Sequence, residues 1–351
     1  MSEKPALRVD KREFNLLIKL LRDIRLLDED FKIKQTDDSI VVPLLRKPTI
    51  EEIEKLSRVK SILQVDVFEP RFKTASVRDA LKNLIPDELL NLVPSSMDLI
   101  GEVAVIQVRD ELRPFVKTIG EAVLKIHPHI KTVLVKSSPI AGTFRVGGYE
   151  VIAGSGETET IYREHGCVYL VDPVKVYVSP RLSYERLRVA SMVKPNEVIL
   201  DMFTGVGCYA ILIAKRVREC KVYAVDLNPN AVKYLKHNIE KNKVENKVIP
   251  IEGDVTKIVE SGLKSMFDRV IMDNPSYAGM FLKTACDALK RTGGAIHYYE
   301  FRPESDLEYG VLEDFHKNVE KFGRSVKSAK MRIVREVAPR RYHIVIDAIV
   351  E

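Results

Sequence analysis

After Pro195 the sequence alternates between short apolar runs and longer amphipathic runs, and this rhythm limits the possible folds more than any other feature. The apolar runs EVILDMF, KVYAVDL, KVIPIEG, RVIMDNP and GGAIHYYEF have the length of strands, and the runs between them have helical periodicity. Strands that alternate with helices predict βαβ units and a doubly wound parallel sheet. The last run, KMRIVREVAPRRYHIVIDAIVE, has two strand-like halves around Ala338-Pro339-Arg340 and predicts an antiparallel hairpin at one edge of that sheet.

The 351 residues are too many for one ordinary core, and the sequence before the alternating region has a different pattern. Apolar residues at helical spacing in 10–35, a strand-like run at 39–45 and a capping box of Thr49 and Glu52 predict a small α/β unit, with 65–76 as its exit linker. A second, mixed pattern of helices and strands follows. We therefore expect an α/β protein whose large C-terminal domain is preceded by two smaller α/β (α+β) domains, with the divisions 1–70, 71–165 and 166–351.

Charge and cysteine content argue against several classes of protein. Lys and Arg number 56 against 50 Asp and Glu, so the net charge of +6 permits an anionic partner such as nucleic acid without requiring one. No apolar run reaches the ~18–20 residues of a membrane span, and we expect no signal peptide. The four cysteines form no Cys-x-x-Cys pair, which predicts reduced thiols of a cytoplasmic protein without a metal: Cys167, Cys208, Cys220 and Cys286. We also expect a monomer.

A glycine-rich turn lies between the first strand and first helix of the alternating region, in VILDMFTGVGCYA. Gly205 and Gly207 there let the backbone approach a ligand, and the helix N-terminus offers unpaired N–H groups. Asp226 ends the next strand, where a carboxylate can accept hydrogen bonds from both ribose hydroxyls. These features alone fit an NAD site as well, because the turn also satisfies G-x-G-x-x-A.

Two further acids favour S-adenosylmethionine (AdoMet) over a dinucleotide. Asp201 ends the strand before the glycine turn, where its carboxylate can meet an ammonium group but would repel a pyrophosphate. Asp254 follows the third strand and can accept from the adenine amino group, with the Val255 amide behind it. Solvated acids at strand ends are the alternative interpretation, and three such acids in order make it the weaker one.

The fourth strand ends in MDNPSYAG, which resembles the (Asn/Asp)-Pro-Pro-Tyr motif of methyltransferases that act on planar nitrogens. The Asn274 amide and a carbonyl fixed by Pro275 can accept from a base amino group, and the Tyr277 ring can stack on the base. An ordinary turn is the alternative. The register of the motif stays open between Asp273 and Asn274.

The combination of FRVGGYEV, VYVSPRLSYERLR, DMFTGVG, DLNPNAV and GGAIHYYEF resembles the archaeal and eukaryotic tRNA (guanine-37-N1)-methyltransferases. SPRLxxER is its specific part, whereas many methyltransferases share the glycine turn. The resemblance covers the chain after residue 75 and, more loosely, the N-terminal unit. It implies a class I (Rossmann-like) methyltransferase domain that transfers a methyl group from AdoMet to N1 of guanine 37, with tRNA as partner.

The resemblance also implies roles for individual residues. Glu185 matches the general base and Arg145 the residue at guanine O6, whereas Arg181 and Arg186 match residues around the ligand and tRNA, and Tyr177 an aromatic near the cofactor. One departure is that the family usually has Asn-Leu-Pro or Asn-Pro-Pro at the fourth strand. The full predicted cofactor-binding set is Tyr177, Arg181, Asp201, Phe203, Gly205, Gly207, Asp226, Leu227, Asp254, Val255, Asp273, Asn274 and Pro275, and the predicted substrate-binding set is Arg145, Arg186, Asn274 and Tyr277.

The chemistry of guanine gives these residue types a purpose. N1 has a proton and must lose it as N1 attacks the methyl group, so a carboxylate can act as base. Negative charge then gathers on O6, where an arginine stabilises it. We expect Arg181 and Arg186, on either side of Glu185, to hold the pKa of Glu185 down. The competing interpretation is a surface pair between Arg181 and Glu185 at i,i+4.

Other functions remain possible at this point. One is a wyosine-pathway enzyme that methylates a tricyclic guanine derivative or transfers the aminocarboxypropyl group of AdoMet. The transferase relatives lack the Arg-x-x-x-Glu-Arg pattern of Arg181, Glu185 and Arg186, which argues against the latter reaction. A non-catalytic tRNA-binding protein is another, although it would not need all three strand-end acids. A dehydrogenase comes last.

Overall fold

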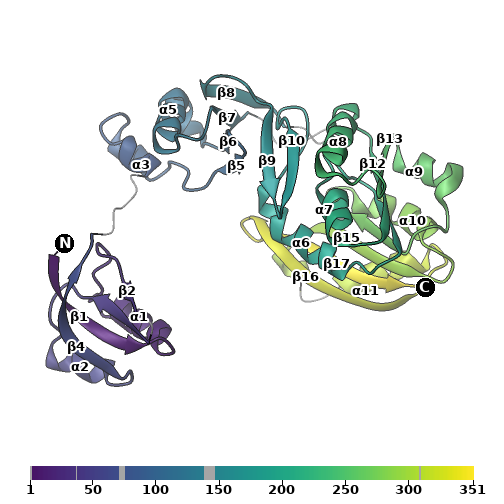
Figure 1. The fold of residues 1–351 in the computed structure, drawn as a ribbon. Coiled ribbons are helices and arrows are strands. Elements are labelled where there is room, and N and C mark those ends of the chain that lie inside the picture. The colour runs from purple at the N-terminus through teal and green to yellow at the C-terminus, as the bar shows by residue number, and fades with distance from the viewer. Residues whose placement is uncertain (1, 37, 71–75, 138–146, 308–309) are drawn as a thin grey trace. The chain divides into compact units, whose positions relative to one another are not determined.

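The computed structural model describes residues 2–36, 38–70, 76–137, 147–307 and 310–351 (Figure 1). The chain divides into two compact units, an N-terminal unit of Met1–Asp79 and a C-terminal unit of Ala80–Glu351. The further division of the second unit at 165/166 stays a prediction. That boundary falls in the turn of a hairpin between β9 (Thr160–Glu164) and β10 (Cys167–Val171).

The N-terminal unit is an antiparallel sheet covered by two helices. The strands lie in the order β2-β3-β1-β4. Apolar residues of α1 and α2 pack on one face of the sheet, and the predicted capping box starts α2. The elements are β1 (Ser2–Asp10), α1 (Phe14–Asp23), β2 (Lys34–Gln35), β3 (Ser39–Pro43), α2 (Ile50–Leu56) and β4 (Ser61–Phe68).

The prediction of a linker over 65–76 is wrong at its start. Residues 65–68 belong to β4, which pairs along its length with β1. The strand signal is present, because Val65-Asp66-Val67 alternates β-branched and polar residues, but the linker prediction joins it to the polar run after it.

A four-stranded sheet begins the C-terminal unit, in the order β5-β6-β7-β8, with α5 packed on β7 and β8. Its elements are α3 (Val77–Ala80, which crosses the unit boundary), α4 (Asp87–Leu90), β5 (Asp98–Ile100), β6 (Val103–Ile106), η1 (Asp110–Phe115), α5 (Val116–Ile126), β7 (Thr132–Lys136) and β8 (Tyr149–Gly154).

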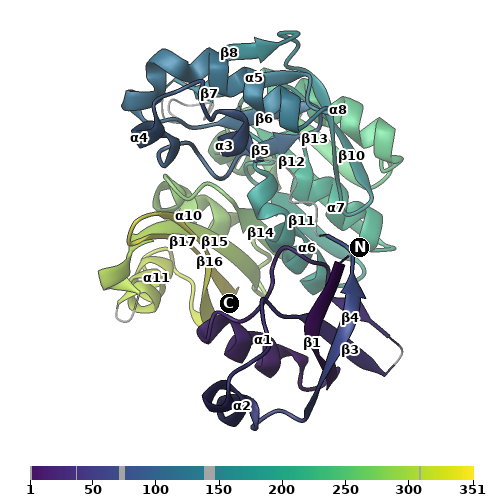
Figure 2. The ribbon, with the colours of Figure 1, turned by 90° about the vertical axis from the view of Figure 1, so that its left-hand side faces the viewer.

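The remainder forms a seven-stranded sheet in the order β13-β12-β11-β14-β15-β17-β16. The first five strands are parallel to one another. β17 is antiparallel to β15, and β16 is antiparallel to β17, so the two form the edge hairpin that the sequence predicted. Helices cover both faces, with α6 to α8 packed on one side and α9 to α11 on the other. Figure 2 shows α7 and α8 on one side of the sheet and α10 and α11 on the other. The fold is therefore the expected doubly wound α/β sheet with an antiparallel edge hairpin.

The bounds of these elements are α6 (Ser183–Met192), β11 (Glu197–Asp201), α7 (Cys208–Arg216), β12 (Cys220–Asp226), α8 (Pro229–Asn242), β13 (Val248–Glu252), α9 (Val255–Ile258), β14 (Arg269–Met272), α10 (Ala278–Ala288), β15 (Gly294–Pro303), α11 (Val311–Glu320), β16 (Val326–Ala338) and β17 (Arg341–Val350), with short helices η2 (Pro180–Leu182), η3 (Val259–Leu263) and η4 (Glu304–Asp306).

Two buried asparagines of α8 hold the β9–β10 hairpin against the seven-stranded domain. The Asn238 amide accepts from the Leu170 N–H (2.7 Å) and donates to its carbonyl (3.1 Å). The Asn242 amide likewise accepts from the Val168 N–H (3.0 Å) and donates to the Val168 carbonyl (2.6 Å). Side-chain amides thus replace a neighbouring strand for β10, whose backbone groups would otherwise be unpaired where they are buried. This attachment places Glu164 of β9 beside α6.

Candidate active site

A cavity of about 460 Å³ opens at the carboxyl ends of the parallel strands, where open α/β sheets bind their ligands. It contains nine of the predicted site residues and several others. The predicted ones are Tyr177, Arg186, Phe203, Gly205, Asp226, Leu227, Asp273, Asn274 and Tyr277, and the others are Val178, Ser179, Leu182, Thr204, Val206, Cys208, Tyr209, Asn228, Ala231, Met280 and Phe281.

Asp226 is fixed at the end of β12 by the glycine turn. One carboxylate oxygen accepts from the Gly205 N–H at 2.7 Å, and the other accepts from the Asn228 N–H at 2.9 Å. Burial raises the pKa of Asp226, and the backbone donors oppose that effect. Each oxygen keeps capacity for one more donor, so a pair of vicinal hydroxyls can bind here.

The two glycines of the turn serve different purposes. Gly205 has φ +57°, and an added Cβ there would meet nothing closer than the Tyr177 carbonyl at 3.7 Å. Gly207 has φ +95°, and an added Cβ would lie 2.6 Å from Leu235 and 2.9 Å from Ile211. Gly205 therefore faces the cavity, whereas Gly207 is needed for backbone conformation and for packing of α7 on α8.

Asp201 is fully buried at the end of β11, and neither carboxylate oxygen has a hydrogen-bond partner among the described residues. Burial raises its pKa to about 7, with the nearby acids Asp273 and Asp226 adding to the effect. The Thr204 hydroxyl and the Phe203 N–H lie near enough to lower this pKa in part, but neither meets hydrogen-bond geometry. A buried carboxylate without a partner is costly, and a bound cation would remove that cost.

Six predicted cofactor residues do not line the cavity, namely Arg181, Asp201, Gly207, Asp254, Val255 and Pro275. Asp254 is the N-cap of α9, and one of its oxygens accepts from the N–H groups of Thr256 (2.8 Å) and Lys257 (3.5 Å). Val255 is buried at the start of α9, and Pro275 lies beside lining residue Asn274. The structure thus gives Asp254 a capping contact that its sequence position alone did not reveal.

The fourth-strand motif faces the cavity with two of its polar side chains. Both Asp273 and Asn274 line the wall, so the geometry leaves the register between them open. Tyr277 is 48% exposed at the N-cap of α10, which leaves its ring available for stacking. The rings of Phe203 and Phe281 meet edge to face at 4.9 Å across the same wall and form an apolar surface for a flat group.

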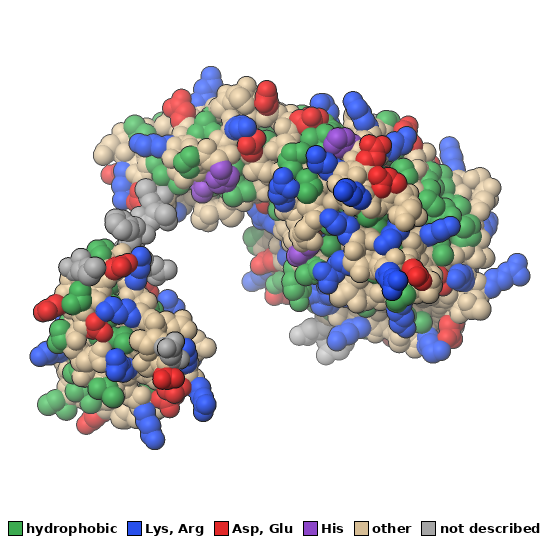
Figure 3. Space-filling view, viewed as in Figure 1, with side chains coloured by type: hydrophobic (Ala, Val, Ile, Leu, Met, Phe, Trp, Pro, Cys, Tyr) green, Lys and Arg blue, Asp and Glu red, His purple; other side chains and the backbone are tan. Residues whose placement is uncertain are grey.

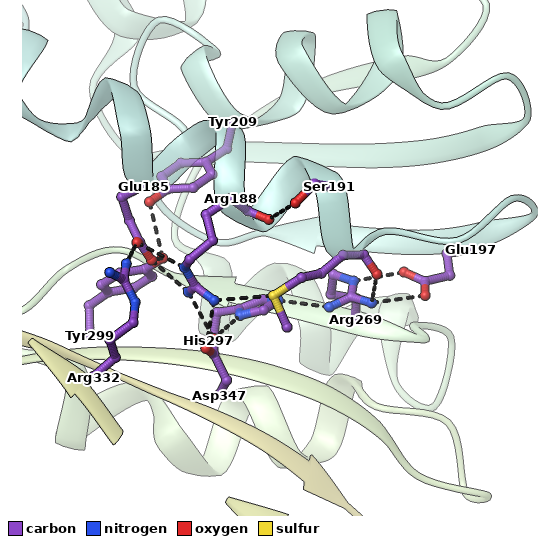
Figure 4. Close-up of polar contacts among 11 residues, drawn as sticks. Glu185, Arg188, Ser191, Glu197, Tyr209, Arg269, His297, Tyr299, Arg332 and Asp347 are labelled. Atoms are coloured by element: carbon purple, nitrogen blue, oxygen red, sulfur yellow. Dashed lines mark hydrogen bonds and ion pairs between the residues drawn. The ribbon is translucent and has the colours of Figure 1, made fainter. Parts of the chain in front are cut away.

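Glu185 lies on α6 and is only 2% exposed (Figure 4). Arg188 donates to both carboxylate oxygens, at 3.0 and 2.7 Å, the Tyr299 hydroxyl donates at 2.7 Å, and Arg332 forms an ion pair. Burial alone would raise the pKa of Glu185, but these donors and cations outweigh it and hold the pKa below its ordinary value. Glu185 is therefore an ionised carboxylate within a basic and hydroxyl-rich cluster.

The arginines that lower the pKa of Glu185 are not the predicted ones. Arg181 is paired with Asp98 of β5 at 2.5 Å and lines a second, polar cavity of about 160 Å³ together with Tyr177. Arg186 points to the cofactor cavity but is buried against Glu164. On a helix, neighbours at i+3 share a face with Glu185, which explains why Arg188 reaches its carboxylate and Arg186 does not.

Arg145, the predicted partner of guanine O6, lies outside the described residues. Within the part of the chain that the structure describes, no cluster of three potential metal ligands occurs. In the same residues, no helix has the length and apolarity needed to cross a bilayer.

Several residues of the site had no signal in the sequence. Some lie close in sequence to predicted residues, as Thr204, Tyr209 and Arg188 do, and the others reach the site from distant elements through the fold. The set includes Glu164, Arg188, Thr204, Tyr209, Phe281, Tyr299 and Arg332. Only Arg188, three residues after Glu185 on a predicted helix, could have been found from spacing.

Three known domain patterns match this sequence. The TRM5/TYW2 methyltransferase domain matches residues 160–334, the TYW2 N-terminal domain matches 77–158, and the tRNA methyltransferase 5 N-terminal domain matches 6–52. The matches follow one another along the chain.

Individual relatives cover most or all of the chain. Trm5b of Pyrococcus abyssi, named a tRNA (guanine(37)-N(1))-methyltransferase, is 38% identical over 342 residues, which is 97% of this chain and 98% of that protein. Its crystal structure has a TM-score of 0.73 and covers 99% of both chains at 36% identity. Taw21 of Saccharolobus solfataricus, named a tRNA 4-demethylwyosine(37)-methyltransferase, is 36% identical over 253 residues, 72% of this chain and 92% of that protein. A complex of aTrm5 with tRNALeu has a TM-score of 0.66 at 32% identity and covers 99% of both chains.

Proposed function

The chain belongs to the TRM5/TYW2 family of methyltransferases, as its sequence motifs predicted, and on that premise we propose that it transfers a methyl group from AdoMet to N1 of guanine 37 in tRNA. The observation that supports this reaction best is Glu185, a carboxylate kept ionised beside the ligand cavity. Methylation of guanine N1 requires a proton acceptor, and an ionised carboxylate provides one.

The cavity fits AdoMet by its own chemistry. Asp226 on the cavity wall suits the ribose hydroxyls. Asp201 does not line the cavity, but its unpartnered carboxylate lies near enough to the lining acids Asp273 and Asp226 to be affected by their charge, and it would suit the ammonium of the methionine part. The edge-to-face pair of Phe203 and Phe281 suits the flat adenine. AdoMet, when bound, supplies an electrophilic methyl group on its sulfonium. We assign the other predicted cofactor residues that line the cavity to the same site, namely Tyr177, Gly205, Leu227, Asp273 and Asn274.

Glu185 would accept the N1 proton of guanine while Arg145 stabilises the negative charge that develops on O6. Asn274 and Tyr277, both on the cavity wall, would hold the base by hydrogen bonding and stacking. Arg188 and Tyr299 orient the Glu185 carboxylate from two different elements, α6 and β15. These residues bind, orient and deprotonate the base.

A tRNA partner agrees with the surface as well. Among the charged side chains on the face of the C-terminal unit in Figure 3, Lys and Arg prevail over Asp and Glu. Cations spread over a surface contact phosphates without reading sequence. The domain match at 6–52 supports a role of the N-terminal unit in tRNA recognition. We place this enzyme in the cytoplasm.

The test uses tRNA transcripts that have either guanine or adenine at position 37, incubated with the protein and methyl-labelled AdoMet and then digested to nucleosides. The proposed function predicts label in 1-methylguanosine from the first transcript and background label from the second. Equal labelling of both transcripts would place the methylated base elsewhere.

A second candidate is methylation of a tricyclic wyosine precursor at the same position, and the 36% identity to Taw21 favours it. The acceptor there is a ring carbon, so Glu185 would have a different task. The Taw21 match covers 72% of the chain, against 97% for Trm5b, so N1 of guanine is the preferred acceptor. Transfer RNA with guanine 37 and transfer RNA with the precursor at that position are each offered with labelled AdoMet. Label in 1-methylguanosine from the first and none in the tricyclic base of the second would exclude the second activity.

A further inference from the structure

The carboxylate of Glu185 is saturated with donors in this structure, and that conflicts with its role as a base. A carboxylate has about four lone-pair positions on its two oxygens. Arg188 and Tyr299 donate to one oxygen, and Arg188 and Arg332 contact the other. No position is left for the proton of a substrate.

Access leads to the same conclusion. Glu185 is 2% exposed and does not belong to the wall of the cofactor cavity. A general base must come within about 2.6–3.2 Å of the proton that it accepts. One of the three donors must therefore leave before guanine N1 can reach the carboxylate.

Two of the three donors are held in place by other contacts. Arg188 also donates to both oxygens of Asp347 on β17, at 2.7 and 3.1 Å (Figure 4). Asp347 in turn accepts from the ring of His297 at 2.5 Å. Tyr299 is fully buried in β15, and its hydroxyl accepts from Tyr209 at 3.1 Å. Neither Arg188 nor Tyr299 can leave without breaking a further buried contact.

Arg332 differs from both. Its side chain is 33% exposed, against 18% for Arg188, and it lies on β16, the edge strand of the sheet. The pairing of β16 with β17 shifts register directly after it, between Ile333 and Arg335. Among the described residues its Nε has no hydrogen-bond partner. A partly exposed guanidinium on an edge strand can turn away without disturbing the core.

We propose that Arg332 is the donor that Glu185 releases when the substrate base arrives, whereas Arg188 and Tyr299 stay and orient the carboxylate. This inference rests on the proposed function. RNA supplies the anion that the released guanidinium needs, because a phosphate binds arginine as a carboxylate does. Arg332 thus blocks the base in the free enzyme and contacts the RNA backbone in the complex.

The experiment compares Arg332→Met with Arg188→Lys, which keeps the charge of Arg188 but loses its two-pronged contact with Glu185 and Asp347. Lys327→Met is the matched control, because Lys327 is an exposed cation of the same strand whose partner is Glu351 rather than a group near Glu185. For each protein we would measure tRNA affinity, the maximal single-turnover methylation rate at saturating tRNA and AdoMet, and the pH profile of the rate at limiting tRNA between pH 4 and 8, which reports the groups of the free enzyme.

Arg332→Met should weaken tRNA binding about tenfold, keep the maximal rate within threefold of wild type, and move the ascending limb of the pH profile to higher pH. The limb moves because one of the cations facing Glu185 is gone while Arg188, Tyr299, Tyr209, Asp347 and His297 remain. Arg188→Lys should do the opposite, with tRNA affinity intact and the rate reduced at least 30-fold. Lys327→Met should leave the rate and its pH profile unchanged.

A maximal rate that falls as far in Arg332→Met as in Arg188→Lys would overturn the inference, because Arg332 would then have to stay in place. An unmoved pH profile in Arg332→Met would also overturn it, because Arg332 would not contact Glu185 in solution. Wild-type protein that forms no 1-methylguanosine would contradict the proposed function instead. The melting temperature of each variant shows whether it is folded. Arg332→Lys, which keeps the cation, should have the wild-type pH profile.

Discussion

Arg186 of α6 and Glu164 of β9 form a buried two-pronged ion pair, with Nε–Oε1 at 2.6 Å and Nη2–Oε2 at 2.5 Å. Arg186 also donates to the Ser179 carbonyl at 3.0 Å, and the Tyr162 hydroxyl donates to Glu164 at 2.5 Å. Both charged side chains are more than nine-tenths buried. The pair joins the β9–β10 hairpin to the helix that holds Glu185.

This geometry predicts that Arg186 acts on stability as well as on substrate binding. Arg186→Met alone should cost about 3–5 kcal/mol of unfolding free energy, because it leaves Glu164 charged and unpaired. The double variant Arg186→Met, Glu164→Leu should recover most of that loss. Denaturant unfolding measures the free energy of unfolding of each variant. The tRNA affinity of the double variant shows whether Arg186 also contacts RNA. Restored stability with affinity still lost would mean that Arg186 itself contacts RNA.

Asp201 makes cofactor affinity depend on pH. Its pKa of about 7 leaves the carboxyl mostly neutral at pH 6 and mostly ionised at pH 8 in the ligand-free protein. Because only the ionised form attracts an ammonium, AdoMet affinity should rise about tenfold over that range. In Asp201→Asn that rise should disappear, while titration of AdoMet itself affects both proteins equally. Calorimetry at the two pH values measures it, and parallel pH dependence in both proteins would contradict the assignment.

The same carboxyl predicts a stability effect of known sign. The folded pKa of Asp201 lies above the ordinary value of 3.8, so its ionisation favours the unfolded chain. The contribution of the neutral carboxyl is complete at low pH and is lost as the pH rises through about 7. Asp201→Asn should therefore raise the melting temperature more at pH 8 than at pH 5. A larger rise in melting temperature at pH 5 than at pH 8 would contradict a raised pKa for Asp201.

Asp226 should account for a measurable part of cofactor binding. Asp226→Ala removes both acceptors for the ribose hydroxyls and should weaken AdoMet at least tenfold, about 1.4 kcal/mol. Glu252→Ala is the control, because Glu252 pairs with Asp226 in the adjacent strand but does not line the cavity. If wild type and Asp226→Ala bound AdoMet with equal affinity, the ribose would not lie at Asp226.

The sheet was predictable because its signals are local. Apolar runs, the glycine turn and Pro339-Arg340 each mark an element within a few residues. The surroundings of Glu185 were not predictable, because Tyr299 is 114 residues away and Arg332 is 147 residues away in sequence. The linker at 65–76 failed for another reason, since the strand that ends at Phe68 runs directly into a polar segment and the prediction assigns its last residues to that segment. No strand is expected at 2–10 either, yet β1 pairs with both β3 and β4.

The N-terminal unit should recognise tRNA outside the anticodon arm. It has its own apolar core, separate from that of the catalytic unit, so its removal should leave the methyltransferase fold intact. Deletion of residues 1–70 should raise the KM for full-length tRNA more than that for an anticodon stem-loop, because only full-length tRNA has the distant contacts. Steady-state kinetics with both substrates measure this, and equal effects on the two would refute it.

The role of Glu185 as the base is the central claim, and single-turnover methylation by Glu185→Gln tests it most directly. Gln has nearly the same shape as Glu but cannot take the N1 proton, so the methyl-transfer step should slow by ~10²–10⁴-fold while tRNA and AdoMet affinities remain nearly unchanged. A wild-type rate at saturating tRNA, with the loss confined to tRNA affinity, would contradict the claim and make Glu185 a structural residue.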